Sequence, residues 1–359
     1  MIKKYEIYIS QIFLKYFIFI SLIFLFLIFF VNILEELKFF SNLNLGLSYP
    51  VLLTLLNIPS LMFEIFPFIF LITSQFFFLN LYDTEEILIL KNNGITNFKI
   101  VKIILFLSLL IGLFIITLFY TFSANLKHSY LNFKNKFTND NKYLAVINEN
   151  GLWLKEEINE QINIINGEYL TKSQISDVTI AQLGADFDLQ RTIVAKTANI
   201  QDFIWVLKDV QIFKENNPNI TQDEMLFQSS FNTEKINNIF SNLSSRNIIQ
   251  LNSLIKDYKK LGYSTLEIKS YLYKLYSYPI FLIVMTTIGA VLMLNVKYNK
   301  SKTINLILGI LLSVMIYYIY YFSNLLGIKE KIPVLVSVVL PHIILVLICT
   351  TGMVKINEK

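Results

Sequence analysis

The sequence predicts an α-helical polytopic membrane protein with six transmembrane helices and an inserted all-β, jelly-roll-like domain. Three observations lead to this prediction. The 359 residues are 54% hydrophobic with a mean hydropathy of +0.54, above the roughly 45–50% apolar content of soluble domains. The apolar residues lie in blocks near both ends of the chain. The middle instead shows short alternating segments, which are typical of β-strands.

Six apolar segments are long enough to cross about 30 Å of hydrocarbon, which takes roughly 20 helical residues. They are residues 12–34, a segment within 51–81, 102–123, 278–296, 303–325 and 333–353. The first is too long for a removed signal peptide and lacks a small-residue cleavage site. Residues 1–124 are therefore expected to hold the first three helices, and residues 278–359 the last three.

Lysines in the short loops predict the orientation, because cytoplasmic loops carry an excess of basic residues. Four segments that six spans place on one side carry lysines: Lys3 and Lys4; Lys91, Lys99 and Lys102; Lys297, Lys300 and Lys302; Lys355 and Lys359. The opposite short loops hold lysines balanced by glutamates: Lys38, Lys329 and Lys331 with Glu35, Glu36 and Glu330. Both termini are therefore expected in the cytoplasm, and residues 125–277 in the periplasm.

Residues 125–245 are predicted to form the β domain. Its expected strands are 143–147, 152–154, 162–165, 178–180, 192–194, 203–206 and 210–213, most of them separated by Gly, Asn or Asp. Short strands at such spacing favour a sandwich or a jelly roll. Residues 246–277 follow as interfacial helices, the first of them with an apolar face over 248–261.

Composition and motifs argue against several classes of function. The stretch 125–270 holds 16 basic and 17 acidic side chains, so it lacks the basic surface of a nucleic-acid binder. No glycine is followed by lysine, which excludes a P-loop, and no zinc or nucleophile-elbow motif occurs. With one cysteine and two distant histidines, the sequence predicts no metal site, no cofactor and no catalytic residue.

Glu64 is the notable charge in a spanning segment, flanked by Pro59 and Pro67. An ionisable group there is a functional candidate. The structural alternative is a carboxylate that reaches interfacial water or bonds backbone freed by Pro67. Tyrosines cluster at 271–278 and 317–321. Tyrosine side chains are common at the membrane interface, which is one interpretation of both clusters. The alternative is that some tyrosines of the fifth helix line a cavity.

The loop between the second and third spans is predicted to contain a short helix at about 83–94. Asp83 or Thr84 would cap its start, and Gly94 would end it. Its apolar side chains, Ile87, Leu88 and Leu90, must be buried against something. A partner ATPase and the chain's own helix bundle would both serve.

At this loop the sequence resembles the LptF/LptG permeases of the lipopolysaccharide export ABC transporter. The resemblance covers nearly the whole chain and rests on motifs in a shared order: Ile58-Pro59, Glu64 and Phe66-Pro67; Glu86-Ile-Leu-x-Leu-Lys-x-x-Gly94; Asn150-Gly151-Leu152-Trp153; Gly327-Ile328 and Ile332-Pro333; Leu340-Pro341. The features around Trp153 and Glu64 look more like LptG than LptF.

The resemblance implies a non-catalytic subunit in the bacterial inner membrane, energised by a cytoplasmic ATPase dimer (LptB-like). It would pair with a paralogous permease and pass lipopolysaccharide to periplasmic bridge proteins (LptC/LptA-like). Glu86, Leu88, Leu90 and Gly94 would form the ATPase-coupling helix. Lipid would contact Lys38 and four aromatic side chains on the first and fifth helices: Phe26, Phe30, Tyr317 and Tyr321. Pro59, Glu64, Pro67, Gly151, Trp153, Pro333 and Pro341 are expected to be structural.

The family's basic cluster after the first span is reduced here to Lys38, which weakens the implied lipid role of this segment. An LptF-type paralogue and an exporter of another lipid remain alternatives. A membrane-tethered scaffold for a periplasmic partner is the alternative from a different class, although six spans exceed what anchoring requires.

Overall fold

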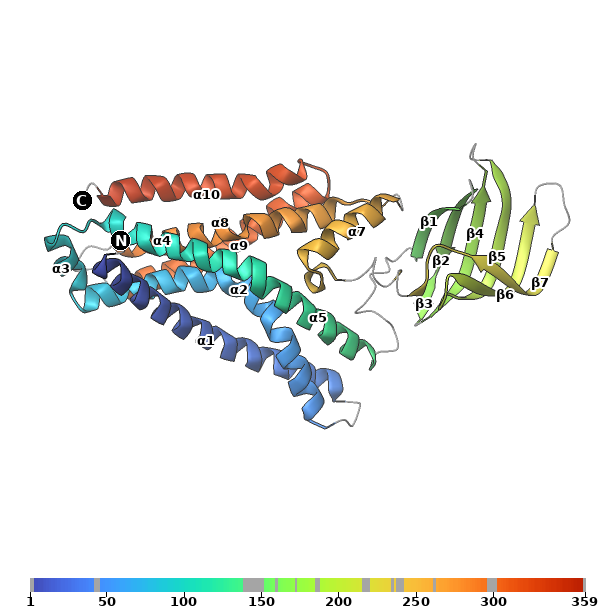
Figure 1. Cartoon of the computed structure of the whole chain (residues 1–359), viewed down its shortest axis with the longest axis horizontal. Coiled ribbons are helices and arrows are strands. Elements are labelled where there is room, and N and C mark those ends of the chain that lie inside the picture. Colours follow the sequence, from blue (N-terminus) through green and yellow to red (C-terminus); the bar gives the residue numbers. More distant parts are fainter. Residues whose placement is uncertain are drawn as a thin grey trace. The chain divides into compact units, whose positions relative to one another are not determined.

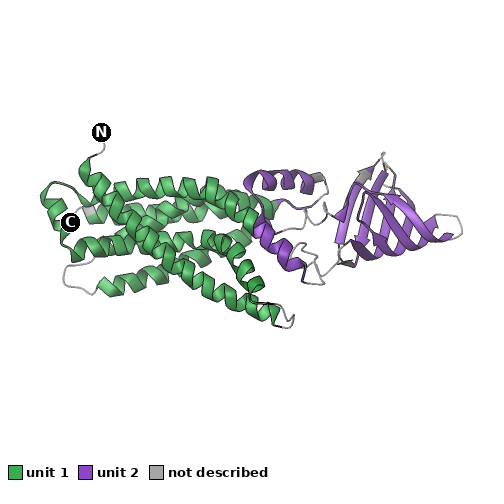
Figure 2. Ribbon diagram, turned by 60° about the horizontal axis from the view of Figure 1, so that its bottom comes forward, with its two compact units in different colours: residues 1–126, 266–359 green, residues 127–265 purple. Residues whose placement is uncertain are grey.

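The computed structural model describes residues 3–41, 46–137, 152–158, 161–171, 173–184, 188–214, 220–233, 236, 242–260, 263–295 and 302–357 (Figure 1). It has two compact units, coloured separately in Figure 2. The helical unit comprises Met1–Leu126 and Leu266–Lys359, and the β unit comprises Lys127–Thr265. The predicted fold class, a polytopic membrane protein with an inserted β domain, is confirmed. The predicted strand 143–147, together with Gly151, Lys297 and Lys300, lies outside the described residues.

Within the described residues, six helices are long and apolar enough to cross a membrane. They are α1 (Lys4–Phe40), α2 (Ser48–Asp83), the run Asn97–Asn135, α8 (Leu266–Leu294), α9 (Lys302–Ile328) and α10 (Val334–Asn357). The third run consists of α4 (Asn97–Phe114), a π-helical turn over Ile115–Phe119, and α5 (Tyr120–Asn135). These helices extend beyond the predicted apolar segments because helical backbone continues through their polar ends.

Residues 266–277 differ from the prediction. They were expected as an interfacial helix that precedes the fourth span, but they are the first turns of α8 itself. No glycine or proline interrupts the chain before Pro279, which lies inside the same helix. A helix of this length carries its first turns well beyond a segment of about 20 residues.

Small and hydroxyl-bearing residues allow α2 and α8 to pack closely. A β-carbon added at Gly289 of α8 would lie 2.5 Å from the carbonyl oxygen of Leu71 on α2. Beside it, Ser74 Oγ donates to the Thr286 carbonyl at 2.9 Å. Thr286 Oγ1 lies 3.0 Å from Ser108 Oγ of α4. This layer ties three spans together in the manner of helix interfaces in membranes.

Two prolines inside helices leave carbonyls that hydroxyl groups of neighbouring helices satisfy. Proline has no N–H, so the carbonyl four residues before it loses its helical donor. For Pro67 of α2 that carbonyl belongs to Phe63, and it accepts a hydrogen bond from the Tyr278 hydroxyl of α8. For Pro341 of α10 the carbonyl belongs to Ser337, and Ser323 Oγ of α9 donates to it at 2.6 Å.

The described part of the β unit forms one antiparallel sheet of seven strands, ordered β1-β2-β4-β5-β6-β7 with β3 also paired to β4. They are β1 (Leu152–Ile158), β2 (Gln161–Gly167), β3 (Tyr169–Thr171), β4 (Gln174–Leu183), β5 (Leu189–Asn199), β6 (Ile204–Lys214) and β7 (Ile220–Gln228). Neighbours in the sheet follow chain order, so the described strands form a meander without a Greek-key crossing.

Three adjacent strands interrupt their alternation in the same row of the sheet. Buried positions change parity between Ile175 and Val178, between Ala195 and Ala198, and between Leu207 and Val210. Asp177 and Asp209, within two of these interruptions, have φ values of 51°. The pairing register is the same on both sides of this row, so the apolar side chains stay on one face without a shift of one strand against the next. The predicted strands 203–206 and 210–213 are therefore a single strand, β6.

A buried polar cluster joins the two edge strands of the sheet. Glu156 of β1 is 4% exposed, and its Oε2 accepts from Ser230 N at 2.8 Å and from Ser229 Oγ at 2.9 Å, just after β7. On its other side Asn163 donates to Glu156 Oε1 at 3.3 Å, and Gln182 donates to Asn163 at 2.7 Å. Because β1 and β7 are opposite edges, the sheet curls until its two edges meet.

The interior of this curled sheet is the β unit's hydrophobic core. Its centre is Trp205, fully buried, whose indole N–H donates to the Phe231 carbonyl at 2.7 Å. Helix α7 (Ile248–Lys260) supplies the apolar face that the sequence predicts, with Leu251 and Leu254 buried and Tyr258 against the core. A short 3-10 helix, η2 (Leu243–Ser245), precedes α7.

Candidate functional site

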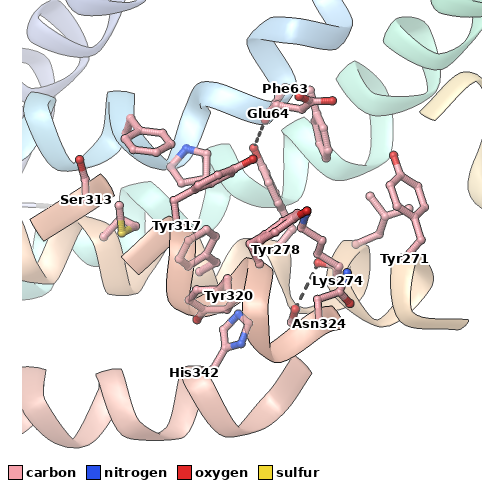
Figure 3. A pocket seen from close by; sticks show the side chains of 17 residues that line it. Phe63, Glu64, Tyr271, Lys274, Tyr278, Ser313, Tyr317, Tyr320, Asn324 and His342 are labelled. Atoms are coloured by element: carbon pink, nitrogen blue, oxygen red, sulfur yellow. Dashed lines mark hydrogen bonds between the residues drawn. The ribbon is translucent and has the colours of Figure 1, made fainter. Parts of the chain in front are cut away.

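The helical unit contains a cavity of about 150 Å³ between α2, α8, α9 and α10 (Figure 3). Helix α2 contributes Glu64 and Pro67, and α8 contributes Lys274 and Tyr278. From α9 come several tyrosines and Asn324, and from α10 comes His342. A cavity of this size holds a ligand as large as benzene.

Glu64 and Lys274 are the charged side chains of the described cavity lining. Both are exposed to the surrounding space, and the two charges interact electrostatically. The charge of Glu64 also acts on Tyr271 and Tyr278 of the lining. Glu64 therefore faces a polar opening, and the carbonyl freed by Pro67 accepts a hydrogen bond from the Tyr278 hydroxyl.

Aromatic rings form most of the cavity wall. Phe63 stacks on Tyr278 with ring centroids 4.5 Å apart and planes 15° apart. Phe281 packs on Tyr320 at 4.4 Å, and Phe68 lies 6.1 Å from Tyr317. The faces of such rings carry a negative quadrupole, so they attract cations as well as apolar groups.

The inner wall of the cavity has unused hydrogen-bonding capacity. His342 is 6% exposed, and its Nδ1 lies 2.8 Å from the Val338 carbonyl. Its Nε2 and the hydroxyl of Tyr320 have no hydrogen-bond partner among the described residues. The two rings meet edge to face, with centroids 4.8 Å apart. Buried polar atoms are normally paired, so this wall is unusual for a region that serves only packing.

Helix geometry places the charged end of the cavity toward one bilayer surface. Nineteen residues separate Glu64 from Asp83 at the end of α2, which at 1.5 Å per residue is about 29 Å. Lys274 lies twenty residues before Leu294 at the end of α8, or about 30 Å. Tyr321 lies about 29 Å from Lys302 at the start of α9. These lengths match the hydrocarbon thickness, so this end of the cavity lies at headgroup height when those helix ends lie at the opposite surface, while Met285 and Ser313 of the lining lie deeper.

Two spans leave most of their apolar surface uncovered. Only 17% of the most apolar window is buried in α1 and in α9, against 33–67% in the other four. On α1, Phe26 and Phe30 are 60% and 62% exposed, and Lys38 in the last turn is also exposed. On α9, Tyr317 and Tyr321 are about half exposed and also line the cavity. The predicted alternative, in which tyrosines of the fifth helix line a cavity, therefore describes Tyr317, Tyr320 and Tyr321.

The predicted short helix is α3 (Glu86–Asn92), and its start differs from the prediction. Asp83 ends α2, and the Thr84 hydroxyl bonds the Asn80 carbonyl, so neither residue caps α3. The residue before α3 is Glu85, in a left-handed conformation without a side-chain cap. Gly94, with φ of 76°, follows the helix, as expected for a glycine terminator.

The apolar residues of α3 are divided between two environments. Ile87 is buried in the helix bundle and Leu90 packs against the same core. Leu88 and Ile89 are 43% and 58% exposed. Glu86 is partly buried, and its Oε2 has no hydrogen-bond partner among the described residues. The exposed pair supplies an outward apolar face, and the inward residues fix α3 to the bundle.

The remaining predicted residues lie apart from the cavity. Pro59 is inside α2 and Pro341 is inside α10. Pro333 precedes α10, and its carbonyl accepts the first helical bond from Ser337 N at 3.0 Å. Trp153 is half exposed on β1. Lys274, Asn324 and His342 line the cavity without having been singled out in the sequence. The one signal for Lys274 is its place within the tyrosine cluster at 271–278.

Among the described residues, six apolar spans and an inserted β unit define a multi-pass membrane protein. The chain belongs to the family described as lipopolysaccharide export system permease LptF/LptG, whose family model matches residues 7–355. The match does not separate LptG from LptF. No individually curated protein matches the sequence.

Proposed function

We propose that this chain is one half of the membrane channel of an ATP-driven exporter that extracts lipopolysaccharide from the inner membrane. Its partners are a paralogous permease, a cytoplasmic ATPase dimer and periplasmic bridge proteins. The family match supports the permease role. The observation that carries the proposal is the low burial of α1 and α9, since two such helices leave room for a second subunit and for lipid between them.

Lipid enters sideways between α1 of one subunit and α9 of the other. Phe26 and Phe30 on α1 present apolar surface to the acyl chains. Tyr317 and Tyr321 on α9 combine apolar rings with hydroxyl groups at headgroup height. Lys38 is an exposed cation at the end of α1, and it attracts a lipid phosphate. The β unit, on the periplasmic side, receives the lipid and passes it to the bridge.

Helix α3 transmits ATPase movement to this channel. The outward pair, Leu88 and Ile89, docks on the ATPase, while Ile87 and Leu90 transfer the displacement to the bundle. Asp83, the last residue of α2 and close in the chain to α3, forms an ion pair with Lys302 at 2.5 Å, which links this end of α2 to the start of α9. ATP-driven closure thus narrows the space beside α9 and pushes lipid toward the β unit.

The test is co-purification of the full chain with its cytoplasmic partner, followed by transport with the Leu88→Glu variant. A charge at position 88, in the exposed pair Leu88 and Ile89, should abolish capture of the ATPase and leave the free energy of unfolding of the helical unit unchanged. The matched control, Thr84→Glu, places the same charge on an exposed residue outside α3 and should retain the ATPase. Failure of the unmodified chain to capture an ATPase would reject the proposal.

A further inference from the structure

The cavity combines two opposite charges with an aromatic wall. Glu64 is the carboxylate and Lys274 the ammonium of the described lining. They come from different helices, α2 and α8, and they interact across the cavity. A site for a purely anionic ligand would contain cationic side chains and no carboxylate, because a carboxylate repels an anion.

The aromatic wall favours a cation beside Glu64. Phe63 and Tyr278 stack on each other beside Glu64, and Tyr317 and Tyr321, about half exposed, offer open ring surface in the same cavity. An ammonium group over such faces gains cation–π attraction, which is stronger when water is displaced. The ammonium of Lys274 in turn offers hydrogen-bond donors to a phosphate. The arrangement complements a zwitterion: an ammonium toward Glu64 and a phosphate toward Lys274.

The position and volume of the cavity suit a lipid headgroup. It lies about 29 Å along α2 from Asp83, which is the height of the headgroups of one leaflet. Its volume of about 150 Å³ accommodates a short aminoalkyl phosphate and excludes a bulky sugar. Tyr317 and Tyr321, which line it, are also half exposed on α9, so an acyl tail has a way out beside that helix.

We propose that this cavity binds the headgroup of a lipid that carries a primary ammonium a few bonds from a phosphate. Two sources supply this chemistry: an aminophospholipid of the bilayer and a lipopolysaccharide decorated with an aminoalkyl phosphate. The inference rests on the proposed export function only for the second source. Glu64 contacts the ammonium, Lys274 contacts the phosphate, and the unpartnered polar atoms of Tyr320 and His342 make the inner wall receptive to polar groups.

The test is native mass spectrometry of the full chain released from lipid nanodiscs. Phosphatidylethanolamine and phosphatidylglycerol with identical acyl chains are compared first, because the first carries the ammonium and the second does not. We expect about tenfold preferential retention of phosphatidylethanolamine, the size of one cation–π contact combined with one partly exposed ion pair. Lipopolysaccharide with and without aminoalkyl phosphate forms the second comparison. Preference in either comparison supports the site and identifies its source.

Variants assign the preference to the cavity. Glu64→Gln should reduce the preference to about twofold or less, since it removes the ion pair and keeps the shape. Glu64→Lys should reverse it toward phosphatidylglycerol. The matched control is Glu267→Gln, an exposed glutamate on α8 outside the lining, and it should bind like the unmodified chain.

The outcomes separate this inference from the proposed function. Equal retention of both lipids in both comparisons overturns the headgroup site, as does an unchanged preference in Glu64→Gln. Neither result depends on the ATPase, so a chain that captures its ATPase yet shows no ammonium preference refutes the site alone. A chain that prefers the ammonium lipid without capturing an ATPase keeps the site and loses the export role.

Discussion

The Tyr278→Phe variant tests how the helix break at Pro67 is compensated. The hydroxyl of Tyr278 is the donor to the Phe63 carbonyl, which Pro67 deprives of its helical partner. Phenylalanine keeps the ring that stacks on Phe63 at 4.5 Å, so the substitution removes the hydrogen bond and little else. The variant therefore isolates the contribution of a single bond.

The expected loss in the free energy of unfolding follows from two known ranges of hydrogen-bond energies. A buried polar group left unsatisfied costs about 1–3 kcal/mol, and hydroxyl bonds between membrane helices have measured contributions of about 0.6 to 1.7 kcal/mol. Because Tyr278 is only 6% exposed, water does not replace the lost donor readily. We expect a loss of about 1.4 kcal/mol, a tenfold rise in the unfolding equilibrium constant. Denaturant titration of the helical unit in mixed micelles measures it.

A double-mutant cycle shows whether the hydrogen bond from Tyr278 compensates for the helical donor that Pro67 lacks. Pro67→Ala restores an N–H that donates to the Phe63 carbonyl, so Tyr278→Phe should cost almost nothing in that background. Tyr318→Phe, at a tyrosine 54% exposed on α9, is the matched control and should be neutral. Equal costs of Tyr278→Phe with and without Pro67 would refute the reasoning.

Three further outcomes are expected. Gly289→Ala should lower the free energy of unfolding by about 1–3 kcal/mol, because its β-carbon would lie 2.5 Å from the Leu71 carbonyl oxygen; a neutral result in mixed-micelle titration would contradict the close approach. Ser323→Ala should cost about 1 kcal/mol in the same assay, since the Ser337 carbonyl loses its donor; no change would mean that the bond contributes nothing. Burial raises the pKa of Tyr263 in the β unit to about 12, against about 10 in the unfolded chain, so its stabilising contribution is complete below pH 10 and is lost as pH rises toward 12. Tryptophan fluorescence should show this loss and its reduction in Tyr263→Phe, and an identical pH profile for both proteins would exclude it.

Hydropathy predicts the spans well because each spanning helix must satisfy its own backbone hydrogen bonds in lipid. It does not predict where helices end, as α8 shows by continuing from Leu266 without a break. In the β unit the sequence identifies the half-buried strands but not β7, whose side chains are mostly exposed and which therefore lacks alternation. An interruption of the alternation, such as the one at Asp209, also divides one strand into two apparent ones.

The cavity was only partly predictable. Glu64 is conspicuous because a carboxylate is costly in a spanning segment. Its counterpart, Lys274, lies 210 residues later in a stretch that resembles any interfacial tyrosine cluster. The bond from Tyr278 to the Phe63 carbonyl likewise depends on the packing of α8 on α2. A sequence pattern describes one helix at a time, whereas these pairs exist only after the helices have packed.

The most direct test of the account is the sidedness of α3 and the β unit. The chain's single cysteine, Cys349, is buried and is replaced by serine, and single cysteines are introduced at the exposed positions Asn92 and Lys196. A membrane-impermeant maleimide applied to intact spheroplasts should label the cysteine at 196 and reach the one at 92 only after permeabilisation. Labelling of position 92 from outside, or of position 196 only from the cytoplasm, would contradict the account.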